Sequence, residues 1–278
     1  MRGCCICESS KNSKLYEKVG DYTLLKCNKC SLVYLKEIFE NNNFIQQASE
    51  DLSKKHTEKV EFWSFPELYE KHKNIFNSFF EERLERLKSF QPIHSLFDIG
   101  CGYGFWMNYC KNNGICTEGI DVSKEAVKYA NVKFNLKVSL SRLENYNFDR
   151  CFDTFTMMDV IEHLEDPNEQ LSKIYDAMND ISLLMIQAPN VLGLTFPGNH
   201  GYGLPFHIWQ FDLNTITRLM EKNGFSLIRY YTGIQGIIGL CEENRYKLLR
   251  KILYSIINRL KVGNRLILLF RRSSLKDK

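Results

Sequence analysis

Residues 96–109 read LFDIGCGYGFWMNY, and this stretch decides the fold. A short apolar run contains Asp98, three glycines follow at alternate positions, and apolar residues then resume. Glycine weakens strands and helices alike, so three of them here indicate a sharp turn or a backbone that lies against another group. The stretch therefore predicts a strand, a tight glycine turn and a helix whose first N–H groups face a ligand.

The chain after this stretch alternates between short runs that favour strands and longer patterns that favour helices. Such alternation is typical of an α/β protein with a mainly parallel sheet. We expect one helix over residues 104–113 and another over 124–134, with Ser123 as its N-cap. The expected strands cover residues 95–100, 115–121, 135–141, 151–160, 181–190, 225–233 and 265–270.

Three segments of different composition predict three parts of the chain. Residues 1–40 are rich in cysteine and contain short apolar runs, which favours a small metal-binding unit. Residues 41–92 begin with a polar run and continue as an aromatic-rich helical pattern. We expect this second segment to form a linker or cap over the ligand site, and residues 93–278 to form the α/β core.

Two cysteine pairs in the first segment have the spacing of a structural zinc site. Cys4-x-x-Cys7 and Cys27-x-x-Cys30 are separated by 19 residues, and each CxxC turn supplies two thiolates to a tetrahedral ion. Cys5 is expected to be a spare thiol or a substitute for Cys4 or Cys7. The pattern predicts a zinc ribbon, with one departure: Glu8 and Ser31 follow the pairs where ribbons often have glycine.

Bulk composition indicates a cytoplasmic protein. The 278 residues are 44% hydrophobic and 25% charged, and the longest apolar runs are far shorter than a membrane span. The opening MRGCCICESS lacks the apolar stretch of a signal peptide. The net charge of +4 hides an asymmetry, because residues 245–278 carry eleven Lys and Arg against one acid. This basic tail suggests an anionic partner or a solvated helix face.

Three kinds of ligand compete for the glycine turn. A phosphate loop needs GxxxxGK[ST], which is excluded because Phe105 and Trp106 follow Gly104. A dinucleotide fingerprint needs GxGxxG, whereas these glycines run GxGxG, so NAD is disfavoured. The remaining pattern, Asp98-x-Gly100-x-Gly102-x-Gly104, resembles motif I of the class I S-adenosylmethionine-dependent methyltransferases.

Four later stretches extend this resemblance over residues 60–272. They are the acidic strand end EGID, FDTFTMMDVIEHLEDP after the fourth core strand, QAPN at the fifth, and GYGLPFHIWQFDLNTITRLMEKNGF. The resemblance implies a Rossmann-like, mainly parallel seven-stranded sheet flanked by helices. It also implies that Asp121 accepts hydrogen bonds from the ribose hydroxyls and that Glu144 lies near the adenine. The cofactor-binding residues that it implies are Asp98, Gly100, Gly102, Gly104, Asp121, Glu144 and Asp159.

Methyl transfer from a sulfonium is an in-line displacement that depends mainly on alignment, while a hydroxyl acceptor also needs a base. His163 and His207 are the candidate bases, with a backbone-bonded loop histidine as the alternative for each. Glu162 or Asp159 is expected to orient the base or contact the cofactor.

Zinc-ribbon methyltransferases similar to this one act in bacterial sugar, polysaccharide and secondary-metabolite pathways. We therefore expect methyl transfer to a hydroxyl of a small molecule or glycan. The alternatives are an RNA methyltransferase that uses the ribbon and basic tail, or a noncatalytic cofactor-binding scaffold. Nucleic acid is disfavoured because the chain lacks NPP[YFW] and any Pro-Cys nucleophile.

The basic tail contains one amphipathic helical pattern, ENRYKLLRKILYSIINRLKVG. We expect its apolar stripe to pack on the sheet, or its basic flank to hold the enzyme peripherally on an anionic membrane. The stripe consists of Leu248, Leu249, Ile252, Leu253, Ile256, Ile257 and Leu260.

Overall fold

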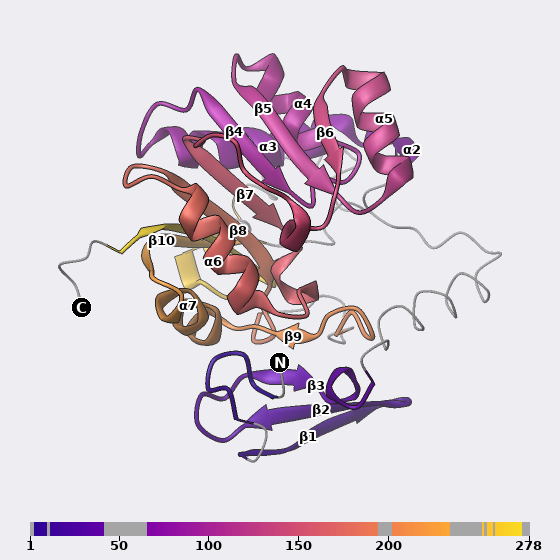
Figure 1. The fold of residues 1–278 in the computed structure, drawn as a ribbon, viewed down its shortest axis with the longest axis vertical. Coiled ribbons are helices and arrows are strands. Elements are labelled where there is room, and N and C mark those ends of the chain that lie inside the picture. The colour runs from indigo at the N-terminus through magenta and orange to yellow at the C-terminus, as the bar shows by residue number, and fades with distance from the viewer. Residues whose placement is uncertain are drawn as a thin grey trace.

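The computed structural model describes residues 3–9, 12–41, 66–193, 202–233, 252, 255–257 and 259–273. A seven-stranded sheet carries helices on both faces, and a separate four-stranded sheet lies at the N-terminal end of the molecule (Figure 1). The first of these sheets is the predicted α/β core.

The large sheet has the strand order β10-β11-β8-β7-β4-β5-β6. Strands β4, β5, β6, β7 and β8 pair in parallel, and β11 is antiparallel to both β8 and β10. All seven expected strands are present, with ends that differ by a few residues from the prediction. Their bounds are β4 (Ser95–Ile99), β5 (Cys116–Asp121), β6 (Lys137–Leu140), β7 (Thr154–Met158), β8 (Leu183–Pro189), β10 (Phe225–Gly233) and β11 (Arg265–Arg272).

Burial on both faces explains why the central strands are continuous apolar runs rather than alternating ones. In β8, Leu184 and Ile186 pack into the cluster under one helical layer, while Leu183 and Met185 pack into the cluster under the other. All four side chains are fully buried. The parallel sheet is therefore covered on both sides, as an α/β core requires.

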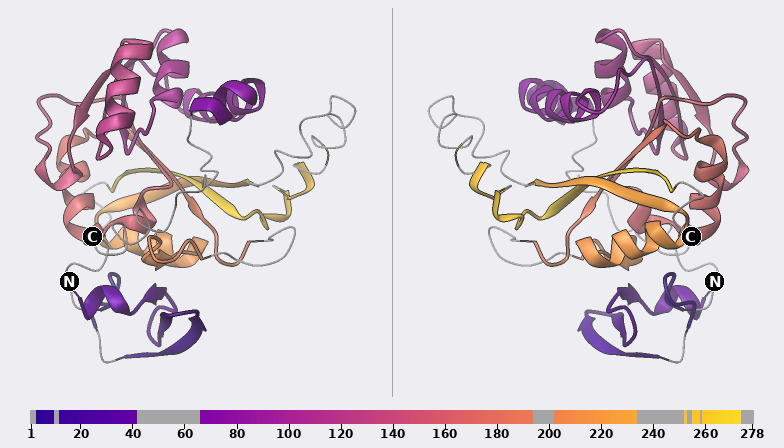
Figure 2. Two further views of the ribbon diagram at one scale, coloured as in Figure 1. Left: turned by 90° about the vertical axis from the view of Figure 1, so that its right-hand side faces the viewer. Right: turned by 90° about the vertical axis from the view of Figure 1, so that its left-hand side faces the viewer.

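The helices form two layers, which the side views of Figure 2 separate. Helices α3 (Lys73–Lys88), α4 (Phe105–Asn112) and α5 (Lys124–Phe134) cover one face. Helices α6 (Pro167–Ala177) and α7 (Leu213–Lys222) cover the other. Ser123 caps α5 as expected, because its side chain accepts a hydrogen bond from the Ala126 N–H.

The aromatic-rich helical pattern expected within residues 41–92 forms two helices in its described part rather than one. Helix α2 (Pro66–Lys71) ends one residue before α3 begins, and His72 between them has a non-helical backbone. Tyr69 of α2 stacks on Phe105 at the start of α4, with ring centroids 3.9 Å apart. Leu87 of α3 instead packs with Trp106 in the core. Helix α2 thus lies against the glycine turn's helix, and α3 completes a helical layer of the large sheet.

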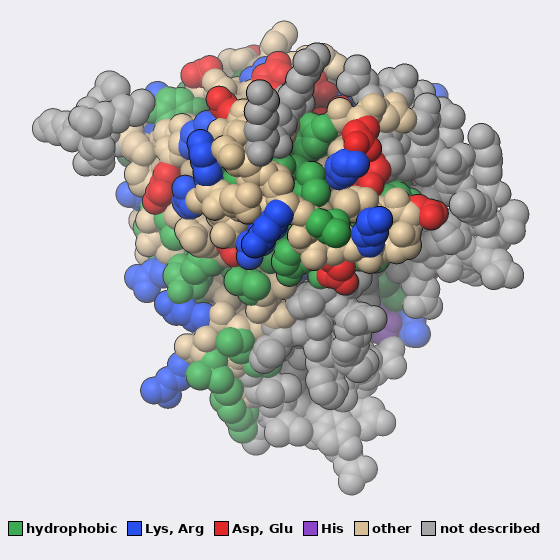
Figure 3. Space-filling view, turned by 90° about the horizontal axis from the view of Figure 1, so that it is seen from below, with side chains coloured by type: hydrophobic (Ala, Val, Ile, Leu, Met, Phe, Trp, Pro, Cys, Tyr) green, Lys and Arg blue, Asp and Glu red, His purple; other side chains and the backbone are tan. Residues whose placement is uncertain are grey.

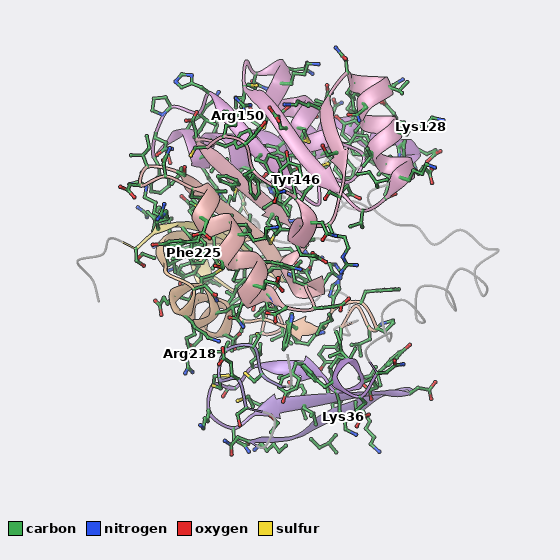
Figure 4. The ribbon with its side chains drawn as sticks, in the orientation of Figure 1. Lys36, Lys128, Tyr146, Arg150, Arg218 and Phe225 are labelled. Atoms are coloured by element: carbon green, nitrogen blue, oxygen red, sulfur yellow. The ribbon has the colours of Figure 1, made fainter. Side chains whose placement is uncertain are left out.

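Aromatic residues of the β6–β7 connection pack on one face of the large sheet. Tyr146 lies over the sheet in Figure 4, and its ring centroid is 5.1 Å from that of Phe97 in β4. The ring centroid of Phe152 is also 5.1 Å from that of Phe97. Arg150, labelled nearby in Figure 4, donates a 2.8 Å hydrogen bond to the buried Glu118 of β5. This pairing satisfies a carboxylate that would otherwise be costly to bury.

The small sheet contains a strand that the sequence analysis did not anticipate. Its order is β1-β2-β3-β9, with β1 (Ser13–Val19), β2 (Tyr22–Cys27) and β3 (Val33–Leu35) from the cysteine-rich segment. Strand β9 (Trp209–Gln210) comes from the core segment, and Tyr34 pairs with Trp209. Trp209 is fully buried and donates a 2.7 Å hydrogen bond to the Leu164 carbonyl. The N-terminal unit is therefore joined to the core through shared strand pairing.

The predicted amphipathic stripe falls largely outside the described residues. Of its described members, Ile257 is buried, while Ile252, Ile256 and Leu260 are exposed. None of the described helices has the length and apolar character needed to cross a membrane. On the face seen from below, basic, acidic and hydrophobic side chains of the described residues are interspersed rather than gathered by charge (Figure 3).

Candidate active site

The glycine turn has the backbone that only glycine adopts without strain. Gly100, Gly102 and Gly104 have φ of +70°, +54° and +78°, all in the left-handed region. Gly104 is also the N-cap of α4. The turn is held to the next strand by hydrogen bonds from the Gly100 and Cys101 N–H groups to the Ile120 carbonyl, at 2.9 and 3.1 Å. The predicted strand, turn and helix are all present.

The surroundings of the three glycines differ. A Cβ on Gly100 would lie 2.5 Å from Cγ2 of Val160, and one on Gly104 would lie 2.7 Å from Cδ1 of Leu136. At Gly102 a Cβ would have no described atom within 4 Å. Close packing thus adds to the need for glycine at the first and third positions. Gly102 faces open space, and it is the glycine whose backbone a ligand can approach.

Asp121 lies beside that open position, at the end of β5. Its Oδ2 accepts a 2.7 Å hydrogen bond from the Gly102 N–H, and its Oδ1 accepts one of 2.8 Å from the Ser123 N–H. Each carboxylate oxygen retains a second lone pair. The carboxylate can therefore brace the turn and also accept hydrogen bonds from a diol, the function predicted for it.

Asp98 occupies a different environment, inside the sheet. The side chain is 2% exposed, and its Oδ1 accepts a 2.6 Å hydrogen bond from the Thr156 hydroxyl. Burial raises the pKa of Asp98 to about 7, against the opposing effect of the Thr156 hydrogen bond and with a contribution from nearby Asp121. Asp98 is thus enclosed by protein groups at the base of the turn.

Glu144 is held by helix α6. It lies in the 3₁₀ turn η2 (Leu143–Asn145), where Oε2 accepts a 3.0 Å hydrogen bond from Gln170 and Oε1 pairs with Arg142. Burial raises the pKa of this carboxyl, but hydrogen bonds from its own backbone N–H, Arg142 and Gln170 bring the pKa below its ordinary value. Its polar contacts are with α6 and Arg142 rather than with the glycine turn.

Asp159 follows β7 and belongs to a network that the sequence analysis missed. Its Oδ2 accepts a 2.6 Å hydrogen bond from Gln187, and its Oδ1 lies 3.3 Å from Nε of Arg265. Arg83 of α3 donates to the same Gln187 side chain. The network joins elements that are far apart in sequence, so no local pattern marks its members. Asp159 also has φ of +56°, a strained conformation for a non-glycine residue.

The structure brings His163 and His207 together. Their ring centroids are 4.8 Å apart, although 43 residues separate them in the chain. His163 ends the 3₁₀ turn η3 (Ile161–His163), and its Nδ1 lies 3.0 Å from the Phe206 carbonyl oxygen. Because a carbonyl only accepts, Nδ1 of His163 carries the proton and Nε2 presents a lone pair.

Both imidazoles are neutral near pH 7. Crowding by protein atoms lowers the pKa of His163 even though part of its ring is exposed. Burial lowers the pKa of His207 to about 3, and repulsion from His163 and Arg265 adds to the effect. Two imidazole lone pairs therefore share one small region of the molecule.

Glu162 completes this cluster. Its side chain is fully buried, and neither carboxylate oxygen has a hydrogen-bond partner among the described residues. One ligand atom from each of Glu162, His163 and His207 lies within 4.8 Å of the other two. We call these three residues the His–Glu cluster. In the sequence Glu162 is next to one candidate base, His163, but only the fold shows that it adjoins both histidines.

The four predicted zinc ligands also come together. The sulfurs of Cys4, Cys7, Cys27 and Cys30 all lie within 4.8 Å of one another. Cys5 is outside this four-sulfur group, and its backbone carbonyl accepts hydrogen bonds from Asn168 and Lys222, both at 2.9 Å. The arrangement suits one tetrahedral ion with no open coordination position.

The two cysteine turns have matching backbones. Glu8 N–H donates to the Cys4 carbonyl at 2.7 Å, and Ser31 N–H donates to the Cys27 carbonyl at 2.9 Å. Glu8 and Ser31 have φ of +54° and +67°, in the left-handed region that favours glycine. These positions are where ribbons often have glycine, and the fold imposes the same conformation here on ordinary residues at some cost in strain.

Comparisons with known proteins agree with this geometry. A family model described as "Methyltransferase domain" matches residues 69–230, more than half of the chain. No curated protein matches the chain. Among solved structures, an S-adenosylmethionine-dependent methyltransferase from Archaeoglobus fulgidus superposes with a TM-score of 0.51 at 23% identity, covering 70% of this chain and 94% of that one. One from Mesorhizobium loti gives 0.50 at 14%, covering 68% and 96%. The chain therefore belongs to the methyltransferase-domain family, and its core has the fold of these S-adenosylmethionine-dependent methyltransferases.

Proposed function

We propose that this methyltransferase methylates a hydroxyl group of a small-molecule or glycan acceptor, and that the acceptor binds at the His–Glu cluster. The observation that carries the proposal is the contact between Gly100 and Val160. A Cβ on Gly100 would lie 2.5 Å from the Val160 side chain, and Val160 precedes Glu162 by two residues. The turn that faces the cofactor and the segment that bears the cluster are thus neighbours.

The predicted cofactor residues fit this assignment. Gly102 leaves room for the cofactor to approach its backbone, and Asp121 has free lone pairs for the ribose hydroxyls. Asp98 and Asp159 support the site from within the sheet and from the end of β7. Glu144 remains the proposed neighbour of the adenine. When bound, S-adenosylmethionine supplies a methyl group that is already activated on a positively charged sulfur.

The His–Glu cluster suits a hydroxyl acceptor because a hydroxyl must lose its proton as it is methylated. The neutral imidazole of His163 can receive that proton directly, or the two imidazoles can hold a group that makes the hydroxyl more acidic. A pKa of about 3 makes His207 a poor base. In either case the acceptor oxygen lies at the histidine pair. An amine acceptor that is already neutral would have less need of such a cluster.

We also propose that the four cysteines hold a structural zinc ion. The four-sulfur group and the two matching turns support this assignment. Metal analysis of the purified chain should find zinc that is lost in Cys27→Ser. A wild-type chain with reduced cysteines and no tetrahedral metal would refute the ribbon.

The physiological setting that we propose is polysaccharide or secondary-metabolite biosynthesis in the cytoplasm, with peripheral contact to anionic membrane. The exposed side chains of Ile252, Ile256 and Leu260 recur every four residues, and Arg259 is next to Leu260 in sequence. Apolar side chains with a basic neighbour suit contact with the surface of an anionic membrane.

The acceptor class can be tested with S-adenosylmethionine that carries a tritiated methyl group. The enzyme is incubated with separated extract fractions that contain nucleotide sugars, lipid-linked glycans, other small metabolites or RNA. We expect the label to enter a small-molecule or glycan fraction as a methyl ether. Label confined to RNA would overturn the proposed acceptor and favour the alternative of an RNA methyltransferase.

A further inference from the structure

The carboxyl group of Glu162 is an anomaly within the described structure. It is fully buried, and both of its oxygens lack a hydrogen-bond partner in the described part of the chain. Burying a polar group without a partner costs several kcal/mol in an apolar surrounding. A native fold retains such a group where it has a use, and an ion at the site is one such use.

The two imidazoles beside this carboxyl have the arrangement of metal ligands. Nδ1 of His163 donates to the Phe206 carbonyl at 3.0 Å, which leaves Nε2 free to bind a cation. A histidine that binds a metal commonly donates its other ring N–H to such a carbonyl, because this fixes the ring and its tautomer. Glu162, His163 and His207 together provide two nitrogens and one carboxylate within 4.8 Å.

The backbone holds the cluster firmly. The Ile208 N–H donates a 2.8 Å hydrogen bond to the Glu162 carbonyl, which ties the η3 turn to the segment that carries His207. The His207 ring also packs over Gly203, where a Cβ would lie 2.3 Å from Nδ1. Strand β9 follows immediately and pairs with β3. Two segments distant in sequence are thus fixed against each other, as a preformed metal site requires.

Asp159 and Arg265 adjoin the cluster. Nε of Arg265 lies 3.3 Å from Oδ1 of Asp159, so the arginine charge is balanced by that carboxylate. Burial and repulsion from Asp159 raise the pKa of the Glu162 carboxyl well above its ordinary value, so a cation that binds there would displace a proton. A divalent cation held by the three residues would attract an anionic oxygen of the acceptor.

We propose that Glu162, His163 and His207 bind one divalent cation of the zinc, iron or manganese type. Two histidines and one carboxylate suit these ions and leave coordination positions open for a substrate. The role of the ion rests on the proposed function: the acceptor binds it through a hydroxyl, together with a neighbouring hydroxyl or carboxylate oxygen. The coordinated hydroxyl loses its proton to water, its oxygen forms the bond to the methyl carbon, and the sulfur keeps the electron pair of the bond that breaks.

Zinc binding to the full chain tests this site without reference to catalysis. Equilibrium dialysis against a series of free zinc concentrations, with the bound metal measured by elemental analysis, compares the wild-type chain with Glu162→Gln and His207→Gln. Zinc at the four cysteines contributes equally to all three proteins. We expect the wild-type chain to bind one zinc ion more than either variant at the same free zinc, with at least a tenfold loss of affinity at the second site.

His94→Gln is the matched control, because His94 is an exposed histidine that directly precedes β4 and is not part of the His–Glu cluster. This variant should bind as much zinc as the wild-type chain. Circular dichroism and calorimetric titration with S-adenosylmethionine show whether each variant is folded, and a folded His207→Gln decides the matter if Glu162→Gln is unstable. Equal zinc binding by all four proteins would overturn the metal site and leave the proposed methyl transfer standing. Failure to find a hydroxyl acceptor would leave the zinc result standing.

Discussion

The buried Asp98 carboxyl should make the stability of the folded core depend on pH. Burial raises the pKa of Asp98 from 3.8 to about 7 in the folded chain, whereas in the unfolded chain it returns to its ordinary value. Between these two values the folded state binds a proton that the unfolded state has released. The free energy of unfolding therefore falls as the pH rises through this window, and the loss is complete above about pH 7.

The shift of about three units corresponds to about 4 kcal/mol in total, at 1.36 kcal/mol for each unit. Asp98→Asn removes the ionisation while keeping an oxygen that can accept the Thr156 hydrogen bond. We expect the variant to gain stability relative to the wild-type chain as the pH rises. The gain between about pH 5 and about pH 8 should be roughly 2 to 3 kcal/mol, since part of the total shift lies below pH 5.

Urea unfolding of both proteins at the two pH values, followed by circular dichroism without cofactor, measures this difference. Other titrating groups contribute equally to both proteins, so the comparison isolates Asp98. Thr156→Val is a useful second variant, because it removes the hydrogen bond that lowers the pKa and should extend the loss of stability to higher pH. A stability difference between Asp98→Asn and wild type that is the same at both pH values would refute the account of a buried, protonated carboxyl.

Three further results are expected. Gly102→Ala should weaken S-adenosylmethionine binding at least tenfold in calorimetric titration, about 1.4 kcal/mol, because its Cβ enters the open space beside Asp121. Gly114→Ala is the control, because Gly114 has a similar left-handed backbone with φ of +81° and a Cβ there would have no described atom within 4 Å. This variant should bind S-adenosylmethionine as the wild-type chain does. Equal losses of affinity in both variants would refute the site. Ser31→Gly should raise the free energy of unfolding by about 0.5–1 kcal/mol through relief of left-handed strain, and a destabilised variant would contradict the strain at φ of +67°. The enzyme should float with anionic liposomes at low salt and be released at high salt, whereas failure to float at low salt would exclude the peripheral contact.

The sequence by itself determined those features that depend on neighbouring residues. The strand, glycine turn and helix of residues 96–109 could be predicted because each conformation there follows from local propensity and from the left-handed backbone that glycine permits. The seven core strands could be predicted because burial on both faces requires continuous apolar runs. The four metal ligands could be predicted because the two cysteines of each CxxC pair lie in one short turn.

Only the tertiary structure decided which distant segments meet. Strand β9 is two residues long, too short for a periodic pattern, and it exists because β3 offers an edge for pairing. His207 approaches Glu162 and His163 because backbone hydrogen bonds join the 206–208 segment to the η3 turn. The contacts of Gln187 with Arg83 and Asp159 depend in the same way on strands and helices already in place. Long-range pairings like these leave no local periodicity, and therefore the chemistry of the His–Glu cluster emerged only from the folded chain.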